Sequence, residues 1–341
     1  MLITGCAGTH SALDGSYFRT ERINAPPFLL TAREHIENQN AEVNLYIEGD
    51  GRAWIRRTHP SHNPTPKYPV AYRLALLDPS KNVIYLARPC QYTELSDELA
   101  CAQKYWTSHR FAPEVIDAMD SAIEDMKQRH QIKGFNLIGF SGGGNIVALL
   151  AERRDDILSF RTVAGNMDHQ LQSQIHDVSK MPQSLNAADI ADKISHIPQI
   201  HYVGAQDKVV PLEIALNYEK KAGEHRCIRI QEIEKIKHTI GWEDAWPTLI
   251  QGTPFCEVPA DISVKLKLVH NVPVAVAIEP VEVQALPAEE EVVSVVEADS
   301  EIQAVAVEEE IAITNETDVV TEDTAHIVAE EEVDDTYILQ D

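Results

Sequence analysis

The sequence predicts an α/β protein that has a mostly parallel central sheet with helices on both faces and an acidic C-terminal tail. Short apolar runs typical of strands alternate with segments whose apolar residues recur every three or four positions, as they do in helices. At one junction between strand and helix stands a serine among glycines. Charge also divides the chain, because residues 268–341 hold 21 of the 54 acidic residues and no Lys or Arg.

Charge and composition predict three parts. An N-terminal segment covers residues 1–25, a folded domain covers 26–256 and a low-complexity tail covers 257–341. From Asn271 onward the tail is built from Val, Ala and Glu, with Tyr337 as its only aromatic residue. We expect the tail to be disordered, because it has little to pack against or pair with, and its partner is unknown. The net charge of −25 argues against nucleic acid as a partner.

The first half of the domain is predicted to alternate strands and helices, with a short loop and a long loop after the first of these strands. Residues 42–47 have the pattern of a strand and lead into the loop Glu48-Gly49-Asp50-Gly51. A Pro-rich loop over residues 54–69 is of the kind that shapes a pocket at a strand end. Further elements are expected as helices within 70–77 and 107–130 and a strand over 82–87.

Ser141 stands at the end of the predicted strand 135–140 and in front of the predicted helix 145–153. A chain that turns at once from strand to helix needs small residues two positions to either side of a serine at the apex. Gly139 and Gly143 fill those positions. The helix would direct its free N–H groups toward Ser141, which favours a developing anion. A plain Gly-rich turn is the alternative interpretation.

The alternation continues to the end of the domain. Strands are predicted at 160–165, 200–204 and 227–233. About 34 residues separate the first two of these strands, enough for a helix near 187–195 and a small cap but not for a large lid. Asp207 and His238 follow the last two strands, in loops at their carboxyl ends.

Ser141, Asp207 and His238 occur in the order of the catalytic residues of α/β-hydrolases, and the chain resembles that superfamily over roughly residues 40–250. The resemblance rests on the serine turn, on the Gly-x-x-Asp-x-x-Val-Pro loop that contains Asp207, and on the late histidine. Each feature also has a plain alternative. Asp207 could be an ordinary turn aspartate, and His238 is one of 14 histidines.

The resemblance implies a serine hydrolase acting on a small acyl substrate. Ser141 would attack the acyl carbonyl, His238 would take its proton, and Asp207 would orient the imidazole. We expect an ester substrate, with a thioester or an amide as other options. The loops 54–69 and 102–111 are expected to set specificity, with Trp54 and Trp106 contacting the substrate.

A function without catalysis is also compatible with these residues. The alternative function is a catalytically silent hydrolase fold that acts as a binding or interaction protein at the cell envelope. No cofactor and no metal are expected, because a Cys-x-x-Cys motif is absent and His59 with His62 lacks a third ligand at recognisable spacing.

The resemblance also implies an oxyanion hole formed by the backbone N–H groups of Gly142 and Asp50. Glu48 stands where a histidine precedes the glycine in the loop of the family. Asp50 brings a carboxylate beside the developing anion. This is unfavourable unless the side chain turns away or pairs with an arginine, for which the candidates are Arg52, Arg56 and Arg57.

The N-terminus resembles the lipobox of bacterial lipoproteins at Leu2-Ile3-Thr4-Gly5-Cys6, and a lipidated Cys6 could attach the protein to a membrane. Only five residues precede Cys6, so a basic and apolar leader would have to start upstream of Met1. The expected location is then the periplasmic side of the cell envelope, and otherwise the cytoplasm. No run of 18 apolar residues is present that would span a membrane.

The number and spacing of the cysteines also bear on where in the cell the protein is located. Lipidation of Cys6 would leave four of the five cysteines to pair. Cys90 with Cys101 is the expected first pair, because the intervening loop closes easily, and Cys227 with Cys256 is the second. Unpaired thiols in a reducing cytoplasm are the alternative.

Overall fold

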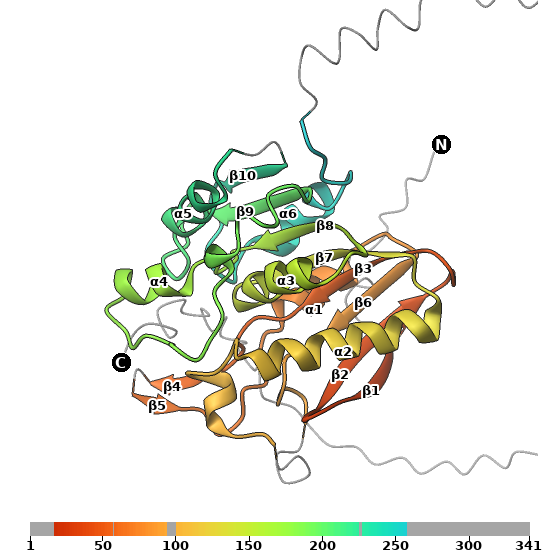
Figure 1. Cartoon of the computed structure of the whole chain (residues 1–341), viewed down its shortest axis with the longest axis horizontal. Coiled ribbons are helices and arrows are strands. Elements are labelled where there is room, and N and C mark those ends of the chain that lie inside the picture. The colour runs from red at the N-terminus through yellow and green to blue at the C-terminus, as the bar shows by residue number, and fades with distance from the viewer. Residues whose placement is uncertain (1–16, 57, 94–99, 225–226, 258–341) are drawn as a thin grey trace, which may run out of the picture. The chain divides into compact units, whose positions relative to one another are not determined.

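The computed structural model describes residues 17–257 except for 57, 94–99 and 225–226. Its centre is an eight-stranded sheet in the order β1-β2-β6-β3-β7-β8-β9-β10 (Figure 1). The strands are β1 (Arg19–Ala25), β2 (Phe28–Ile36), β3 (Glu42–Ile47), β6 (Asn82–Leu86), β7 (Gly134–Phe140), β8 (Ile157–Val163), β9 (Gln199–Gly204) and β10 (Ile228–Ile233). A separate ribbon pairs β4 (Trp54–Arg56) with β5 (His59–Pro60).

The sheet is parallel from β6 to β10 and antiparallel at its other end. Strands β6, β3, β7, β8, β9 and β10 run in one direction. Strands β1 and β2 form a hairpin, and β2 pairs antiparallel with β6. Every residue of β7 is buried, as expected for a parallel strand covered on both faces. The predicted mostly parallel sheet is therefore confirmed.

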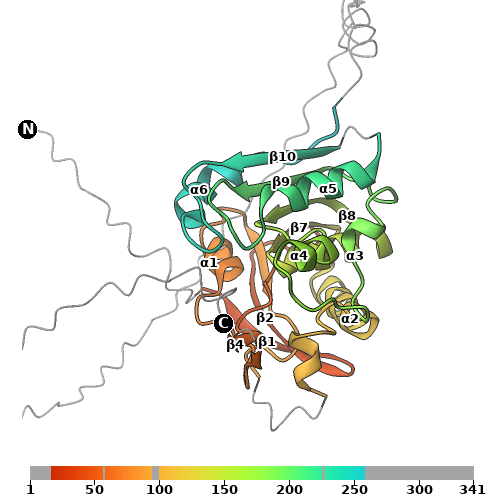
Figure 2. The ribbon, with the colours of Figure 1, turned by 90° about the vertical axis from the view of Figure 1, so that its left-hand side faces the viewer.

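Helices cover both faces of the sheet (Figure 2). Helices α1 (Val70–Leu76) and α6 (Trp242–Leu249) pack on one face, and α2 (Pro113–His130), α3 (Gly142–Arg153) and α5 (Leu212–Ala222) pack on the other. The apolar stripe of α2 was readable from its spacing of three and four, and all of its members are buried: Val115, Ile116, Met119, Ile123 and Met126. The connections hold α4 (His169–Ile175) and the short 3₁₀ turns η2 (Gln103–Trp106) and η3 (Ala187–Asp189).

Two expectations about the fold need correction. Strand β1 lies inside the predicted N-terminal segment 1–25 and pairs along its length with β2, so the sheet begins before residue 26. The charged Arg19 and Glu21 share a side of β1 with the buried Ile23 and Ala25, so apolar and polar residues do not alternate along the strand. The helix expected near 187–195 is only the 3₁₀ turn η3 followed by further turns. Pro198 follows closely, and a residue before proline disfavours helical geometry.

Both expected disulfides are present. Cys90 is bonded to Cys101 with Cα atoms 5.5 Å apart, and Cys227 is bonded to Cys256 with Cα atoms 4.0 Å apart. Cys6 and the tail from residue 258 lie outside the described residues, so lipidation and disorder stay predictions. Within the described ranges, no helix is both long and apolar enough to cross a membrane.

Candidate active site

Ser141 occupies the sharp turn between β7 and α3. Its φ is 48°, a value that residues with a side chain rarely adopt. The backbones are packed so closely that a Cβ on Gly139 would collide with the backbone of Gly143, and a Cβ on Gly143 would collide with the carbonyl of Ile47. The glycines are therefore needed for the turn, and the turn leaves Ser141 partly exposed between a buried strand and a buried helix start.

A chain of hydrogen bonds connects Ser141 to a buried histidine and aspartate. His238 Nε2 lies 3.0 Å from Ser141 Oγ, and His238 Nδ1 lies 2.8 Å from Asp207 Oδ2. Asp207 Oδ1 accepts hydrogen bonds from the backbone N–H groups of Val209 and Val210, at 2.8 and 2.9 Å. The side chains of His238 and Asp207 are 3% and 0% exposed, so water does not compete for these bonds.

The parallel strands explain why three residues distant in sequence meet. Ser141, Asp207 and His238 follow the carboxyl ends of β7, β9 and β10, which all lie at the same edge of the sheet. The His238 ring packs on Phe140 with ring centroids 5.2 Å apart. The backbone carbonyl of His238 accepts a hydrogen bond from Trp242 Nε1 at 2.9 Å. The imidazole is thus held from several sides.

The loop after β3 passes directly over the serine turn. A Cβ added to Gly49 would lie 2.9 Å from the Phe140 ring and 3.2 Å from Ser141 Cβ. Among the described residues, the N–H groups of Gly142 and Asp50 have no hydrogen-bond partner. Two unpaired N–H donors next to a nucleophile are what an oxyanion hole requires.

Glu48, at the position where the family has a histidine, fastens this loop internally. Its carboxylate accepts hydrogen bonds from the backbone N–H groups of Gly49 and Ala71, at 3.0 and 3.4 Å, which ties the loop to the first turn of α1. The side chain is buried, and burial raises the pKa of Glu48 to about 7.

The Asp50 side chain does pair with arginines, but with different ones from those expected. Its carboxylate lies 3.3 Å from Arg88 Nη1 and 2.5 Å from Arg110 Nη1. Of the three expected partners, Arg52 and Arg56 are exposed residues without a hydrogen bond to Asp50, and Arg57 lies outside the described residues. Arg88 follows β6 at the same carboxyl edge, so the parallel sheet rather than proximity in sequence brings it to Asp50. A search of strand ends for basic residues would have found it.

The two predicted substrate contacts differ in their surroundings. Trp54 lies on β4 and is 37% exposed. Trp106 is 5% exposed, belongs to the hydrophobic core and donates its Nε1–H to Ser61 O at 3.0 Å. This corrects the expectation for Trp106, because a buried and internally bonded indole has no free face to offer to a substrate.

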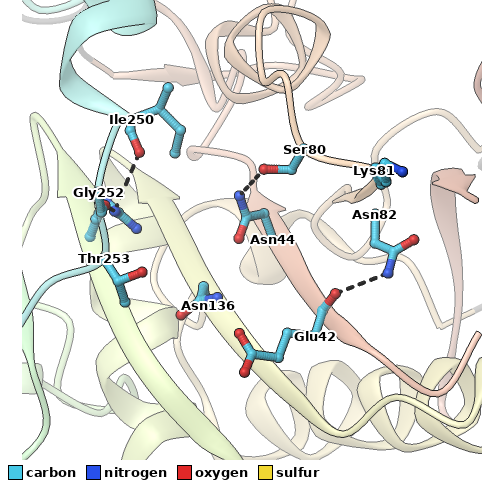
Figure 3. A pocket seen from close by; sticks show the side chains of 10 residues that line it. Glu42, Asn44, Ser80, Lys81, Asn82, Asn136, Ile250, Gly252 and Thr253 are labelled. Atoms are coloured by element: carbon cyan, nitrogen blue, oxygen red, sulfur yellow. Dashed lines mark hydrogen bonds between the residues drawn. The ribbon is translucent and has the colours of Figure 1, made fainter. Parts of the chain in front are cut away.

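A polar pocket of about 320 Å³ lies at the opposite, amino edge of the sheet (Figure 3). It is lined near the starts of β3, β6 and β7 by Glu42, Asn44, Asn82 and Asn136, away from the strand ends that carry Ser141. Within the described part of the chain, no group of three or more His, Cys, Asp or Glu side chains is arranged to hold a metal ion.

Strand order, parallel direction and a serine at the strand-to-helix turn together define the α/β-hydrolase fold. No protein family and no curated protein sequence matches this chain. Among solved structures, it is similar to the esterase Pf2001 of Pyrococcus furiosus, with 12% identity and a TM-score of 0.50 over 72% of this chain and 95% of that one.

Two further structures are more distant in shape. The chain is similar to Est1E from Butyrivibrio proteoclasticus, with 14% identity and a TM-score of 0.46 over 68% of this chain and 97% of that one. It is also similar to the esterase domain of a Rhodothermus marinus protein, with 14% identity and a TM-score of 0.47 over 68% and 94% of the two chains. At such identities the likeness concerns the fold alone.

Proposed function

We propose that the protein is a serine hydrolase that cleaves an ester through an acyl-enzyme intermediate. The observation that carries the proposal is the unbroken hydrogen-bond chain from Asp207 through His238 to a partly exposed Ser141. Two backbone N–H groups near the serine, those of Gly142 and Asp50, have no partner in the part of the chain that the structure describes, which adds to it. Each of these features alone occurs in non-catalytic proteins, but their combination at one strand end matches the roles that acyl transfer needs.

In the proposed mechanism, Ser141 Oγ attacks the acyl carbon while its proton passes to His238 Nε2. The N–H groups of Gly142 and Asp50 hold the resulting oxyanion, and each such donor contributes on the order of 3 kcal/mol to the transition state. The tetrahedral intermediate then expels the alcohol, which takes the proton from His238. Water then attacks the acyl-serine and gives its proton to His238. When the acyl–Oγ bond breaks, His238 returns that proton to Ser141 Oγ and the acid product leaves.

The connection between β8 and β9 suggests soluble substrates of short or medium acyl length. It holds only the seven-residue α4 and the turn η3, and neither is a large lid that could open at a lipid surface. A series of p-nitrophenyl esters of graded chain length, together with matched amides, tests this. The expected order is short or medium esters first, and amides and emulsified long-chain lipid last. Strong activation at a lipid–water interface would contradict it.

The test of the proposed function compares the wild type with Ser141→Ala on the best ester of that series. We expect turnover to fall by at least about 10⁴-fold while the unfolding transition stays cooperative. Turnover that survives this substitution in a folded protein would overturn the proposal and favour the silent binding protein.

We also propose an oxidising compartment such as the cell envelope as the place of action. Two disulfides support this, because such bonds persist outside reducing cytoplasm. Mass spectrometry of the unreduced protein from its native host is the test, with two bridges and a lipid on Cys6 expected. Five free thiols would contradict both the location and the anchor.

A further inference from the structure

An excess of positive charge lies beside the proposed nucleophile. A Cβ added to Gly142 would collide with the carboxylate of Asp50, so this carboxylate lies against the residue that follows Ser141. Two guanidinium groups, those of Arg88 and Arg110, share that single carboxylate. Burial raises the pKa of Asp50, but Arg110 and Arg88 outweigh burial and hold the pKa below its usual value. Asp50 is therefore ionised, and the three groups carry one net positive charge.

The other acidic side chain in this region does not balance the charge at neutral pH. Glu48 is buried and has its pKa raised to about 7, so it is largely protonated in mildly acidic solution and only partly ionised at neutrality. His169 adds no charge of its own, because burial and the nearby Arg110 lower its pKa. Keeping a partly buried cation without a counter-ion is unfavourable unless something else supplies the negative charge.

Arg110 has a donor to spare, whereas Arg88 is enclosed. Arg110 donates Nε–H to Thr107 O at 2.9 Å and Nη1–H to Asp50, but Nη2 has no partner among the described residues, and the side chain is 18% exposed. The Arg88 side chain is 5% exposed and donates to the Arg110 carbonyl, which fixes the backbone that carries Arg110. Arg88 thus acts as a support, and Arg110 presents the free N–H groups.

We propose that Arg110 binds a carboxylate of the substrate, so that the ester cleaved at Ser141 carries one negative charge. The proposal rests on the proposed function and names the substrate class for it. Arg110 is separated from Gly142 only by the Asp50 carboxylate, which places it within reach of a short acid chain on a bound ester. The single net charge matches a carboxylate better than a doubly charged phosphate, and charge-assisted bonds from arginine to a carboxylate are among the strong ones.

A purely structural role for the same residues is the competing explanation. Asp50, Arg88 and Arg110 could serve only to hold the loop that carries the oxyanion donor. In that case, loss of Arg110 would weaken turnover of charged and neutral esters alike. If Arg110 binds a carboxylate away from the reacting bond, its loss acts selectively on the charged ester and chiefly on KM.

The experiment uses two matched pairs of esters. Mono-4-nitrophenyl glutarate and its methyl ester differ in charge on the acyl side, and 3-carboxyphenyl acetate and its methyl ester differ in charge on the alcohol side. Release of the phenol gives kcat and KM for the wild type, for Arg110→Gln and for the control Arg153→Gln. Arg153 pairs with Asp117 at the far end of α3 and is the matched loss of one positive charge.

We expect the wild type to prefer the charged ester by at least about 10-fold in kcat/KM in one pair, and the preference to shrink as salt increases. Arg110→Gln should reduce that preference by about 10- to 100-fold, mainly through KM, and Arg153→Gln should keep it. A wild-type preference for the neutral ester in both pairs overturns the proposal. So does an equal loss for both members in a folded Arg110→Gln variant.

A separate measurement keeps this result apart from a failure of the proposed function. Calorimetric titration of glutarate monomethyl ester into Ser141→Ala, with and without Arg110→Gln, reports anion binding without catalysis. Binding that disappears with Arg110 supports the carboxylate site even if no ester is turned over. Turnover without any such binding would retain the hydrolase and remove the carboxylate site.

Discussion

The two edges of the central sheet are both rich in polar side chains, but they use them differently. At the amino edge, Asn44 donates to Ser80 and Asn82 donates to the Glu42 carbonyl (Figure 3). Asn82 also accepts from two backbone N–H groups and donates to a second carbonyl, and Asn44 also donates to Asp78. At the carboxyl edge, Ser141 has strained backbone geometry, and the N–H groups of Gly142 and Asp50 and the Nη2 of Arg110 have no partner within the described ranges. At the first edge the asparagine side chains bond to neighbouring groups of the fold, and at the second edge donors beside Ser141 stay available for a ligand.

This difference shows that a pocket locates an active site less reliably than unpaired hydrogen-bonding groups and backbone strain do. A pocket lies at the amino edge, yet Asn82 and Arg161 in its lining hold the strand starts and the segment after α6 together. Polar groups without a hydrogen-bond partner and strained backbone are costly in a folded protein. Their presence at one place is explained if they take part in a reaction. We therefore assign function to the carboxyl edge and structure to the amino edge.

The comparison is tested most strongly by removing His238 or Asp207. We expect His238→Ala to lower kcat/KM by at least about 10⁴-fold and Asp207→Asn by about 10³- to 10⁴-fold, because the three residues act as a unit. The double variant Ser141→Ala/His238→Ala should be no worse than either single variant. Ester kinetics on folded protein provide the measurement, and multiplicative losses in the double variant would show that the residues act independently.

Glu48 should make stability depend on pH. Its folded pKa of about 7 lies above the ordinary value of 4.5, so the folded state holds a proton that the unfolded state has lost between these values. The contribution is fully present below about pH 4.5 and is lost as the pH rises through 7, with a total of roughly 3 kcal/mol.

Urea unfolding of the wild type and Glu48→Gln at pH 5 and pH 8 measures this effect. The amide cannot ionise, so the variant does not lose this contribution at high pH. The unfolding free energy of Glu48→Gln minus that of the wild type should therefore be larger at pH 8 than at pH 5. Equal pH slopes for the two proteins would show that Glu48 is not buried as a protonated acid.

The amino edge should respond in stability and not in activity. Arg161 is 3% exposed and donates Nη2–H to the carbonyls of Ile250 and Gly252, just after α6. Replacing it with Met leaves these acceptors without their donor, which we expect to cost about 2 kcal/mol of unfolding free energy. The kcat/KM of the folded variant should stay within about twofold. A large loss of activity at full stability would instead place function at this edge.

Much of the carboxyl edge could be predicted from the sequence, because its signals are local. Gly139 and Gly143 mark a turn that only small residues allow. Asp207 and His238 lie in the loops after two strands whose carboxyl ends must share one edge in a parallel sheet. The structure brings these residues together at hydrogen-bond distance. Strand β1 is hard to recognise because only Ile23 and Ala25 on its inner side are apolar. The other two residues on that side, Arg19 and Glu21, are charged.

Pairing across the sheet could not be predicted in the same way. Asp50 was expected to pair with arginines close in sequence, but the order of the strands sets β6 beside β3 and brings Arg88 to it. Arg110 arrives from a loop fixed by the Cys90–Cys101 disulfide and by η2. Strand order and loop paths depend on the packing of the whole domain, and no local pattern carries them.

The most direct test of the assignment to the carboxyl edge is labelling with a fluorophosphonate, which reacts with activated serines. The protein is incubated with the probe and digested, and the modified peptide is identified by mass spectrometry. We predict one adduct, on Ser141, that disappears in the folded His238→Ala variant because the serine is no longer activated. Absence of any adduct on the wild type, or an adduct on another serine, would contradict the central claim.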